Sequence, residues 1–470
     1  MTAVSKQGKF TEGKLFQQIL LFVLPIIATN LLQTLYNAAD MMVVSLSSEV
    51  NAVGAVGTTS SFVALIVNIF IGFSVGANVV VARHIGAGDR ERAQKASHTA
   101  LIVGLFFGVV GGGIGIAVSR PVLKMMGNTG NLLDLAVKYT YFYFAGVPFL
   151  ALTNNLIAVF RAKGDSKTPL IVLAFSGLLN VGLNLFFVLV LDMSVEGVAL
   201  ATAIANVASF LALLWKLSKD QEGLAFSFKR LKIDRKELGD IVAIGLPSAI
   251  QSSLFCISNM LVQSSIVQVN NSVCPPDSKY QPVVNGASAG TNVSNFVYMA
   301  QNAVYQGALT FTSQNLGANK PKRIFPIAGC CCLLVSIIGV SLSSLIFLFK
   351  DPLLALYGVV DGAEGSLEAL AMDAATTQLI YNSLPYFLCG FMEVGSGVLR
   401  GLGKSFTSMI ISLIGSCLLR VVWLLTVFPA YPTLATIYVC YPITWALTAV
   451  VLHTCAIVVI NRKIKLGRNQ

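Results

Sequence analysis

Long apolar runs alternate with short polar segments along the whole chain. Twelve runs reach the length of about 20 mostly apolar residues that a membrane-spanning helix needs. They cover residues 16–41, 51–79, 97–118, 137–159, 170–191, 196–217, 241–267, 288–316, 326–349, 376–398, 406–428 and 434–459. No basic leader with a small-residue cleavage site precedes the first run, so we expect it to be a retained span. The pattern predicts an all-α integral membrane protein with twelve transmembrane helices.

The composition excludes a soluble globular protein. The chain has 470 residues, of which 55% are hydrophobic and 11% charged, and its mean hydropathy is +0.76. About a quarter of the residues of a soluble domain are charged. Eight of the nine cysteines lie in apolar runs, where a free cysteine packs as a small hydrophobic residue. We therefore expect neither a disulfide framework nor a cysteine metal site.

The positive charges fall mostly on one side of the predicted spans. Alternate loops together with both termini hold 26 of the 32 Lys and Arg residues, and the other loops hold five. By the positive-inside rule this imbalance places both termini in the cytoplasm. The net charge of +11 is then a topology signal, and we expect no nucleic-acid partner. The predicted location is the plasma (inner) membrane of a prokaryote, as a multi-pass protein.

Matching motifs on the two sides of a long basic loop indicate an internal repeat. "IGAGDRERA" after the second run matches "LGANKPKRI" after the eighth, and "RAKGDSKTP" after the fourth matches "RGLGKSFTS" after the tenth. We therefore expect an N-terminal six-helix lobe over 1–218, a cytoplasmic linker over 219–240 and a C-terminal six-helix lobe over 241–470. Two such bundles around a central cavity are a transporter architecture, with binding near the membrane midplane.

Only three charged side chains fall well inside the predicted spans: Asp40, Glu393 and Arg420. A charge at the centre of a span costs about 2.5–3.5 kcal/mol on insertion scales, so each is a functional candidate. Asp40 has no Lys or Arg within ten residues on either side. Gln33, Asn37 and Asp40 are spaced by four and three, which places them on one face of a helix. We therefore expect Asn37 to be a cation-coupling residue together with Asp40.

The chain resembles the multidrug and toxic compound extrusion (MATE) family, and its DinF-like branch in particular. The resemblance rests on "LYNAAD" with a preceding proline, "GAG", "RAKGD" and "RGLG" at the ends of their helices, and on the plan of six plus six helices. It implies a twelve-helix antiporter that exports organic, often cationic, compounds in exchange for protons or sodium ions. Such a protein is not an enzyme, binds small organic substrates and the lipid bilayer, needs no cofactor besides an ion gradient, and is expected to work as a monomer.

The resemblance also implies a cation-coupling cluster in the N-terminal lobe, made by Asp40, Tyr36, Asn180 and Thr202, with Asn184 at a position where relatives often have Asp. A sodium site at Asp40, Asn180 and Thr202 is the alternative to a proton site. Burial raises the pKa of a carboxyl group and amide donors lower it, so a carboxyl in such a site can exchange a proton. We hypothesise that protonation of Asp40 bends the first helix about Pro25, which lacks a backbone N–H, and that substrate then leaves.

Two further groups are candidates in the C-terminal lobe. Glu393 and Arg420 are predicted to form an ion pair, either as a structural lock between helices or as a second functional site. Polar residues at spacings of three and four along 288–316 are predicted either to line the substrate cavity or to join helices by hydrogen bonds: Asn295, Tyr298, Asn302 and Tyr305. Together with Gln33, these six residues are the substrate-cavity candidates.

Other functional classes fit the sequence less well. A lipid-linked oligosaccharide flippase of the same broader superfamily would share the helices and the repeat, but it would need more basic residues inside to meet a pyrophosphate. An intramembrane enzyme would need a nucleophile with a base, or a metal cluster, and the three histidines of the chain form no such group in the sequence. No GxxxxGK[ST] motif is present, which argues against export driven by ATP. The identity of the exported compounds is beyond the sequence.

Overall fold

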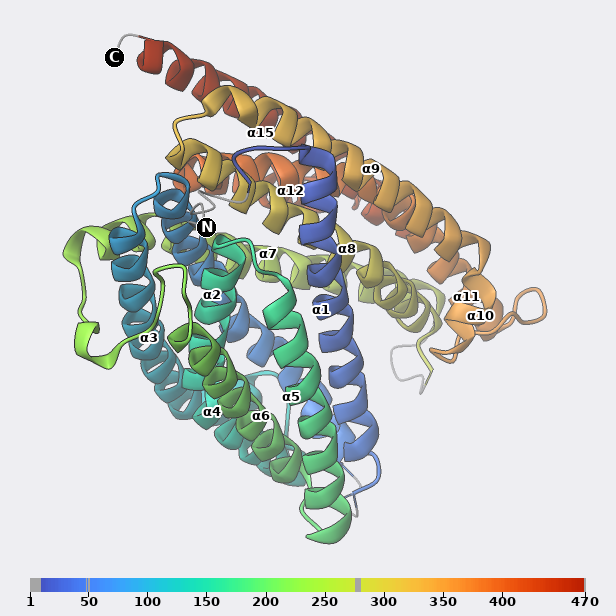
Figure 1. The fold of residues 1–470 in the computed structure, drawn as a ribbon. Helices are drawn as coiled ribbons and strands as arrows, with labels where there is room; N and C mark the ends of the chain where they lie inside the picture. Colours follow the sequence, from blue (N-terminus) through green and yellow to red (C-terminus); the bar gives the residue numbers. More distant parts are fainter. Residues whose placement is uncertain (1–9, 48, 50, 275–279, 469–470) are drawn as a thin grey trace. The chain divides into compact units, whose positions relative to one another are not determined.

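Helices make up almost all of the computed structural model, which describes residues 10–47, 49, 51–274 and 280–468 (Figure 1). The six helices of the first half are α1 (Leu15–Val44), α2 (Ala52–Gly86), α3 (Arg90–Met125), α4 (Gly130–Ala162), α5 (Lys167–Leu185) and α6 (Val195–Ser218). A π-helical turn, Phe186–Val190, extends α5, and a 3-10 turn, Phe228–Arg230, lies in the loop after α6.

The second half repeats this plan with more breaks. Its elements are α7 (Arg235–Val273), α8 (Pro282–Gly317), α9 (Ile324–Leu348), α10 (Lys350–Ala355), α11 (Leu367–Gln378), α12 (Tyr386–Gly401), α13 (Ser405–Ser412), α14 (Leu419–Thr426) and α15 (Leu434–Arg468), with a 3-10 turn at Pro321–Arg323. A π-helical turn, Leu379–Ser383, follows α11, and another, Leu413–Leu418, joins α13 to α14. π-turns occur in α5 and in α13–α14, which the repeat pairs with each other.

Every run expected to span the membrane lies on helix, so the all-helical class is confirmed. Among the described residues, ten helices are long and apolar enough to cross a bilayer. The two expected spans outside this group are α8, which carries a row of amides and hydroxyls, and the tenth, which Pro385 divides into α11 and α12. Both departures have a physical cause, because polar side chains lower the hydropathy of α8 and proline cannot continue the backbone ladder.

The chain divides into two compact units. Unit 1 contains Leu24–Ser252, Ser313–Asn319 and the residues up to Gly13, and unit 2 contains Lys14–Val23, Ser253–Thr312 and the chain from Lys320 onward. Residues 219–240, expected as a linker, are therefore part of unit 1, as is nearly the first half of α7, up to Ser252. The boundary also crosses α1, between Val23 and Leu24, one residue before Pro25.

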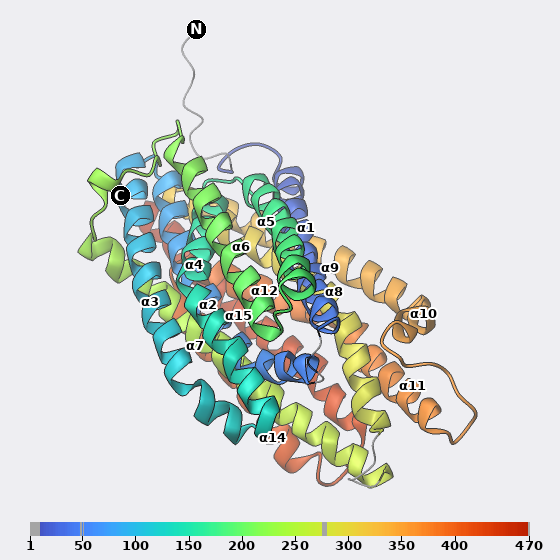
Figure 2. The same ribbon diagram turned by 90° about the horizontal axis from the view of Figure 1, so that it is seen from below.

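Small residues allow close helix packing within unit 1. The helices α3, α4 and α6 lie side by side, with α4 against α2, α3 and α6 (Figure 1, Figure 2). A Cβ atom at Gly108 of α3 would lie 2.7 Å from the Cα of Pro148 of α4. A Cβ atom at Gly72 of α2 would lie 2.5 Å from the Cα of Ala249 of α7. Such backbone approaches are typical of helix pairs in membranes, where small residues replace the hydrophobic driving force.

Unit 2 has a corresponding centre in α12. This helix packs against α9 and α15, and most of its residues from Cys389 to Gly401 are buried. Ile437 and Tyr438, near the start of α15, form one apolar cluster with Val283 and Ala287 of α8. The beginning of α8 therefore lies at the end of unit 2 opposite the end of α15.

Candidate functional site

Asp40 of α1 is bonded to two buried amides of α5. Asn184 donates from Nδ2 to Asp40 Oδ1 at 2.5 Å. In the amide orientation that satisfies its partners, Asn180 also donates to Asp40 Oδ1, at 2.8 Å, and its oxygen accepts from the Thr202 hydroxyl of α6 at 3.3 Å. Asn184 is fully buried and Asn180 nearly so. The structure therefore brings together Asp40, Asn180, Asn184 and Thr202, and we call these four residues the N-lobe cluster.

Tyr36 and Asn37, the other expected coupling residues, and Gln33, a substrate-cavity candidate on the same helix, lie outside the N-lobe cluster. The Tyr36 hydroxyl donates to the backbone carbonyl of Ala174 on α5, at 3.0 Å, and Gly177 leaves the space for its ring. Gln33 and Asn37 are exposed, and in the described part of the chain neither bonds to the cluster. Tyr36 and Asp40, four residues apart, share the α5-facing side of α1. Asn37 is rotated about the helix axis by about 100° from Tyr36 and about 60° from Asp40, and Gln33 lies almost two turns before Asp40.

Sequence reasoning missed two tyrosines near Asp40. Tyr139 and Tyr143 of α4 interact electrostatically with the Asp40 carboxyl. Their rings stack at 5.9 Å between centroids, and Tyr139 is buried. Their spacing of four residues within a span was the available signal. Over the described residues, Asp40 forms no ion pair with Lys, Arg or His, so the groups around it are neutral amides, hydroxyls and phenols.

The expected ion pair between Glu393 and Arg420 is wrong. Arg420 of α14 is buried and donates from Nη1 to Asn259 Oδ1 of α7 at 3.0 Å. Its guanidinium lies 3.9 Å from the ring centroid of Tyr441 on α15. A planar guanidinium can use its edge for hydrogen bonds and its face for an aromatic ring, and this site satisfies both without a carboxylate.

Glu393 of α12 instead faces α8 and the end of its own helix. Its electrostatic partners are Arg400, Tyr298 and Tyr305. Arg400 donates from Nη1 to the Tyr305 hydroxyl at 2.5 Å, and both side chains are buried. Arg400 was counted with the cytoplasmic loops because it lies close to the end of an apolar run. The structure corrects this assignment, since Arg400 belongs to the buried polar group of unit 2.

The polar row of α8 is divided between two environments. Tyr305 is packed against Arg400, and Tyr298 hydrogen-bonds to Asn302 within the helix. Asn295 is exposed, as is part of the Tyr298 side chain. The Tyr305 end of the row therefore packs within unit 2, whereas the Asn295 end presents exposed polar groups.

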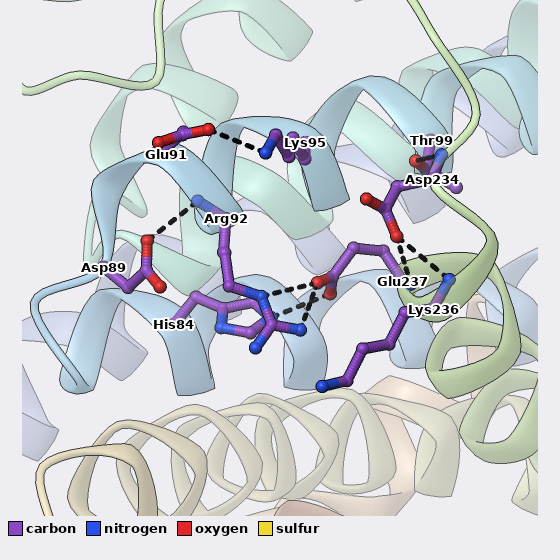
Figure 3. A network of polar contacts seen from close by, with 9 residues as sticks. All are labelled: His84, Asp89, Glu91, Arg92, Lys95, Thr99, Asp234, Lys236 and Glu237. Carbon is purple, nitrogen blue, oxygen red and sulfur yellow. Dashed lines mark hydrogen bonds and ion pairs between the residues drawn. The ribbon is translucent and has the colours of Figure 1, made fainter.

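A third polar group joins α2 and α3 to the start of α7 in unit 1 (Figure 3). Glu237, which is 1% exposed, lies with Oε2 2.7 Å from His84 Nε2 and accepts from Arg92 Nη2 at 2.6 Å through Oε1. Asp89 caps α3 by accepting from the Arg92 backbone N–H at 3.0 Å. Sequence reasoning missed this group because all its charges lie near the ends of spans, where charged residues are ordinarily solvated.

Asp234 caps α7 in the same region. It accepts from the backbone N–H groups of Lys236, at 2.9 Å, and Glu237, at 3.2 Å. These bonds hold the pKa of the Asp234 carboxyl below its usual value. The preceding loop is attached to α3 through the His98 ring, whose Nε2 accepts from the Ser227 N–H at 3.2 Å. The loop and the cap together explain why residues 219–240 pack with unit 1.

An all-helical fold with many candidate spans, a repeated plan and a partly buried carboxylate held by neutral groups is typical of a multi-pass membrane transporter. The family model MatE matches residues 25–186 and 244–425, one segment in each half, and the chain belongs to this family. The resemblance to the MATE family is thereby confirmed, and the DinF-like branch stays a prediction.

The chain is similar to curated members of the family over most of its length. The probable multidrug resistance protein YoeA of Bacillus subtilis (strain 168) is 27% identical over 414 residues, which cover 86% of this chain and 85% of that protein. The multidrug export protein MepA of Staphylococcus aureus is 22% identical over 404 residues, with the same shares.

Solved structures show the same fold. The outward-facing conformation of a multidrug resistance MATE family transporter of the MOP superfamily matches with a TM-score of 0.87 and 20% identity, over 99% of this chain and 100% of that one. A crystal structure of MATE in the bent conformation matches equally well, with a TM-score of 0.87, 20% identity and the same coverage.

Proposed function

We propose that this protein is a secondary active antiporter that exports organic, often cationic, compounds in exchange for protons. Its family membership supports export, since YoeA and MepA are described as multidrug resistance and multidrug export proteins. We further propose that it works as a monomer in a prokaryotic plasma membrane with both termini in the cytoplasm. The coupling residue of this proposal is Asp40.

The observation that carries the proposal is the neutral environment of Asp40. An ionised carboxylate inside a span costs about 2.5–3.5 kcal/mol unless it is compensated. The amide donors of Asn184 and Asn180 offset part of this cost for the charged form. Because none of the described Lys, Arg or His residues pairs with this carboxylate, its protonated and ionised states can both be populated. A group with two accessible states is what coupling to a proton gradient requires.

Protonation changes which bonds the cluster can make. The ionised Asp40 is an acceptor only, whereas the protonated form has one O–H to donate. The Asp40 carboxyl group then accepts hydrogen bonds from Asn184 and Asn180 less well. The contact between α1 and α5 must therefore rearrange. We propose that α1 bends near Pro25 in response, because proline removes a hydrogen bond from the helix ladder there. The boundary between the compact units also lies within two residues of Pro25.

Substituting Asp40→Asn tests this proposal, because it keeps the size of the side chain but removes the titrating group. In proteoliposomes with an imposed proton gradient and a fluorescent cationic substrate, we expect transport to fall to the level of empty vesicles. The control is Asn37→Ala, on the same helix but outside the cluster, which should transport as the wild type does. Full transport by a correctly inserted Asp40→Asn protein would contradict the proposal.

Sodium coupling is the second candidate, and the cluster offers a specific reason to test it. Asp40, Asn180 and Thr202 carry carboxylate, amide and hydroxyl oxygens, and hard cations prefer oxygen ligands. Sodium binding here would require the Asn180 amide to turn its oxygen toward Asp40. The same vesicles with a sodium gradient in place of the proton gradient distinguish the two ions. Failure under both gradients would favour the lipid-linked oligosaccharide flippase.

A further inference from the structure

A cavity of about 330 Å³ lies in unit 2, and none of its lining residues belongs to the polar groups described above. It is bounded by the first turns of α8 and by the loop that follows α10. Its walls are formed by Tyr280, Asn285, Ser288, Ala289, Asn292, Tyr357, Gly358 and Val359. We call it the α8 pocket. Its size lies within the range of small-molecule sites, which are commonly about 300–1,000 Å³.

The wall opposite α8 is held in place by the fold. The chain turns at Gly358, whose φ of +76° is a conformation that suits glycine. The Val359 N–H donates to the carbonyl of Leu354 at 3.1 Å. Val359 is buried in an apolar cluster that also contains Ala289 and Val293 of α8. The α8 pocket is therefore a preformed cavity between two fixed walls.

Three side chains on the α8 wall have unused hydrogen-bonding groups. Asn285, Ser288 and Asn292 are spaced by three and four, so they share one face of the helix. Within the part of the chain that the structure describes, none of the three makes a side-chain hydrogen bond. Each Asn amide has an NH2 group that donates and an oxygen that accepts, and the Ser288 hydroxyl can donate and accept. Together they form an array whose bonds are left to water or to a ligand.

The lining also indicates what kind of ligand fits. None of the lining residues is Asp, Glu, Lys, Arg or His, so nothing in the walls favours a charged group. Amides and hydroxyls pair well with hydroxyl groups, and the two tyrosines add aromatic surface. From these groups we infer that the α8 pocket is a binding site for neutral polyhydroxylated compounds, such as glycosides.

The pocket continues the polar row of α8 toward the middle of the span. The face that carries Asn285, Ser288 and Asn292 continues to Asn295 and Asn302, a distance of about 25 Å along the helix axis. Asn302 bonds to Tyr298, which is an electrostatic partner of Glu393. This step rests on the proposed export function. The α8 pocket is then a binding site at the outer end of α8, where a neutral hydroxylated substrate is held before release.

Equilibrium binding to the full-length protein in lipid nanodiscs tests the inference without any gradient. The probes are 4-nitrophenyl β-D-glucopyranoside, which is neutral and hydroxylated, and tetraphenylphosphonium, which is an apolar cation. The pocket variants are Ser288→Trp, which fills the cavity, and the double variant Asn285→Ala with Asn292→Ala, which removes the amides. Gln263→Ala on α7 is the control, because it removes an exposed amide outside the pocket.

We expect the wild type and Gln263→Ala to bind the glucoside equally, and both pocket variants to bind it at least tenfold more weakly. Binding of tetraphenylphosphonium should not change. Equal glucoside binding by all four proteins, or none by the wild type, would overturn the inference. Asp40→Asn separates this result from the proposed function: it should keep glucoside binding while losing proton-driven transport.

Discussion

At the scale of single residues, the charges of the two units are stabilised in different ways. Asp40 accepts from amides that suit its charged form, and no basic side chain in the described part of the chain pairs with it. Arg420 is held by an amide oxygen and an aromatic face. Both sites were visible in the sequence as charges inside apolar runs, but their partners were not. The partners come from helices that are distant along the chain, and residue type alone does not reveal which helices meet.

Because Arg420 is not paired with Glu393, exchanging their charges should not restore stability. Arg420→Gln loses the charged hydrogen bond to Asn259 and the contact with Tyr441, which should lower the free energy of unfolding by about 1.5–3 kcal/mol. The double variant Glu393→Arg with Arg420→Glu should be no more stable than the less stable single variant. Thermal unfolding of the purified proteins measures the stability of the single and double variants. A double variant as stable as the wild type would show that Glu393 and Arg420 form an ion pair after all.

The buried Glu237 gives a residue-scale prediction with an internal control. Glu237→Gln removes the charge between His84 and Arg92, and we expect it to lower the free energy of unfolding by about 1–3 kcal/mol. Glu91→Gln removes an exposed i,i+4 pair with Lys95 nearby, which should cost less than about 0.5 kcal/mol. The melting temperatures of the two variants in detergent compare them directly. A similar effect of both changes would show that burial of Glu237 adds nothing.

At the scale of helices, α1 links the coupling residue to the proposed hinge. Pro25→Ala returns a backbone N–H to the helix, and alanine is about 3 kcal/mol more favourable than proline in a helix interior. We expect slower transport, by about tenfold, from a protein that is at least as stable as the wild type. Pro121→Ala in α3 is the matched control, because it changes a proline inside a helix outside the cluster. Unchanged transport by Pro25→Ala would exclude bending at this position.

The same scale shows what apolar periodicity can and cannot predict. Apolar runs of about 20 residues predicted where the long helices lie, because backbone groups in lipid must be satisfied within a helix, and ten of the twelve expected spans are long and apolar enough to cross a bilayer. The division at Pro385 and the π-turns were not predicted, since both leave the apolar composition of the run unchanged. Arg400 was misplaced for a related reason: the end of a run in the sequence does not mark the end of burial when a partner such as Tyr305 is present.

At the scale of the whole molecule, the distribution of basic residues predicts the orientation in the membrane. In a background without the native cysteines, a cysteine at Asp361, in the loop after α10, should react with a membrane-impermeant maleimide in intact cells. A cysteine at Lys404, between α12 and α13, should react only after permeabilisation. The opposite pattern would reverse the orientation, and with it the proposal that the α8 pocket faces outward.

The attachment of residues 219–252 to unit 1 has a consequence for how the protein is made. His84 and Arg92 are synthesised long before Glu237, the residue that holds them. When the sixth helix has entered the membrane, the glycine faces of α2 and the basic end of α3 still lack their neighbours. The N-terminal half is therefore incomplete until the ribosome has delivered the start of α7. If the gene is divided after residue 218, the first fragment should not complete its folding until the second fragment is present. If the gene is divided beyond α7, the first fragment should fold unit 1 completely except for its contacts with residues 313–319.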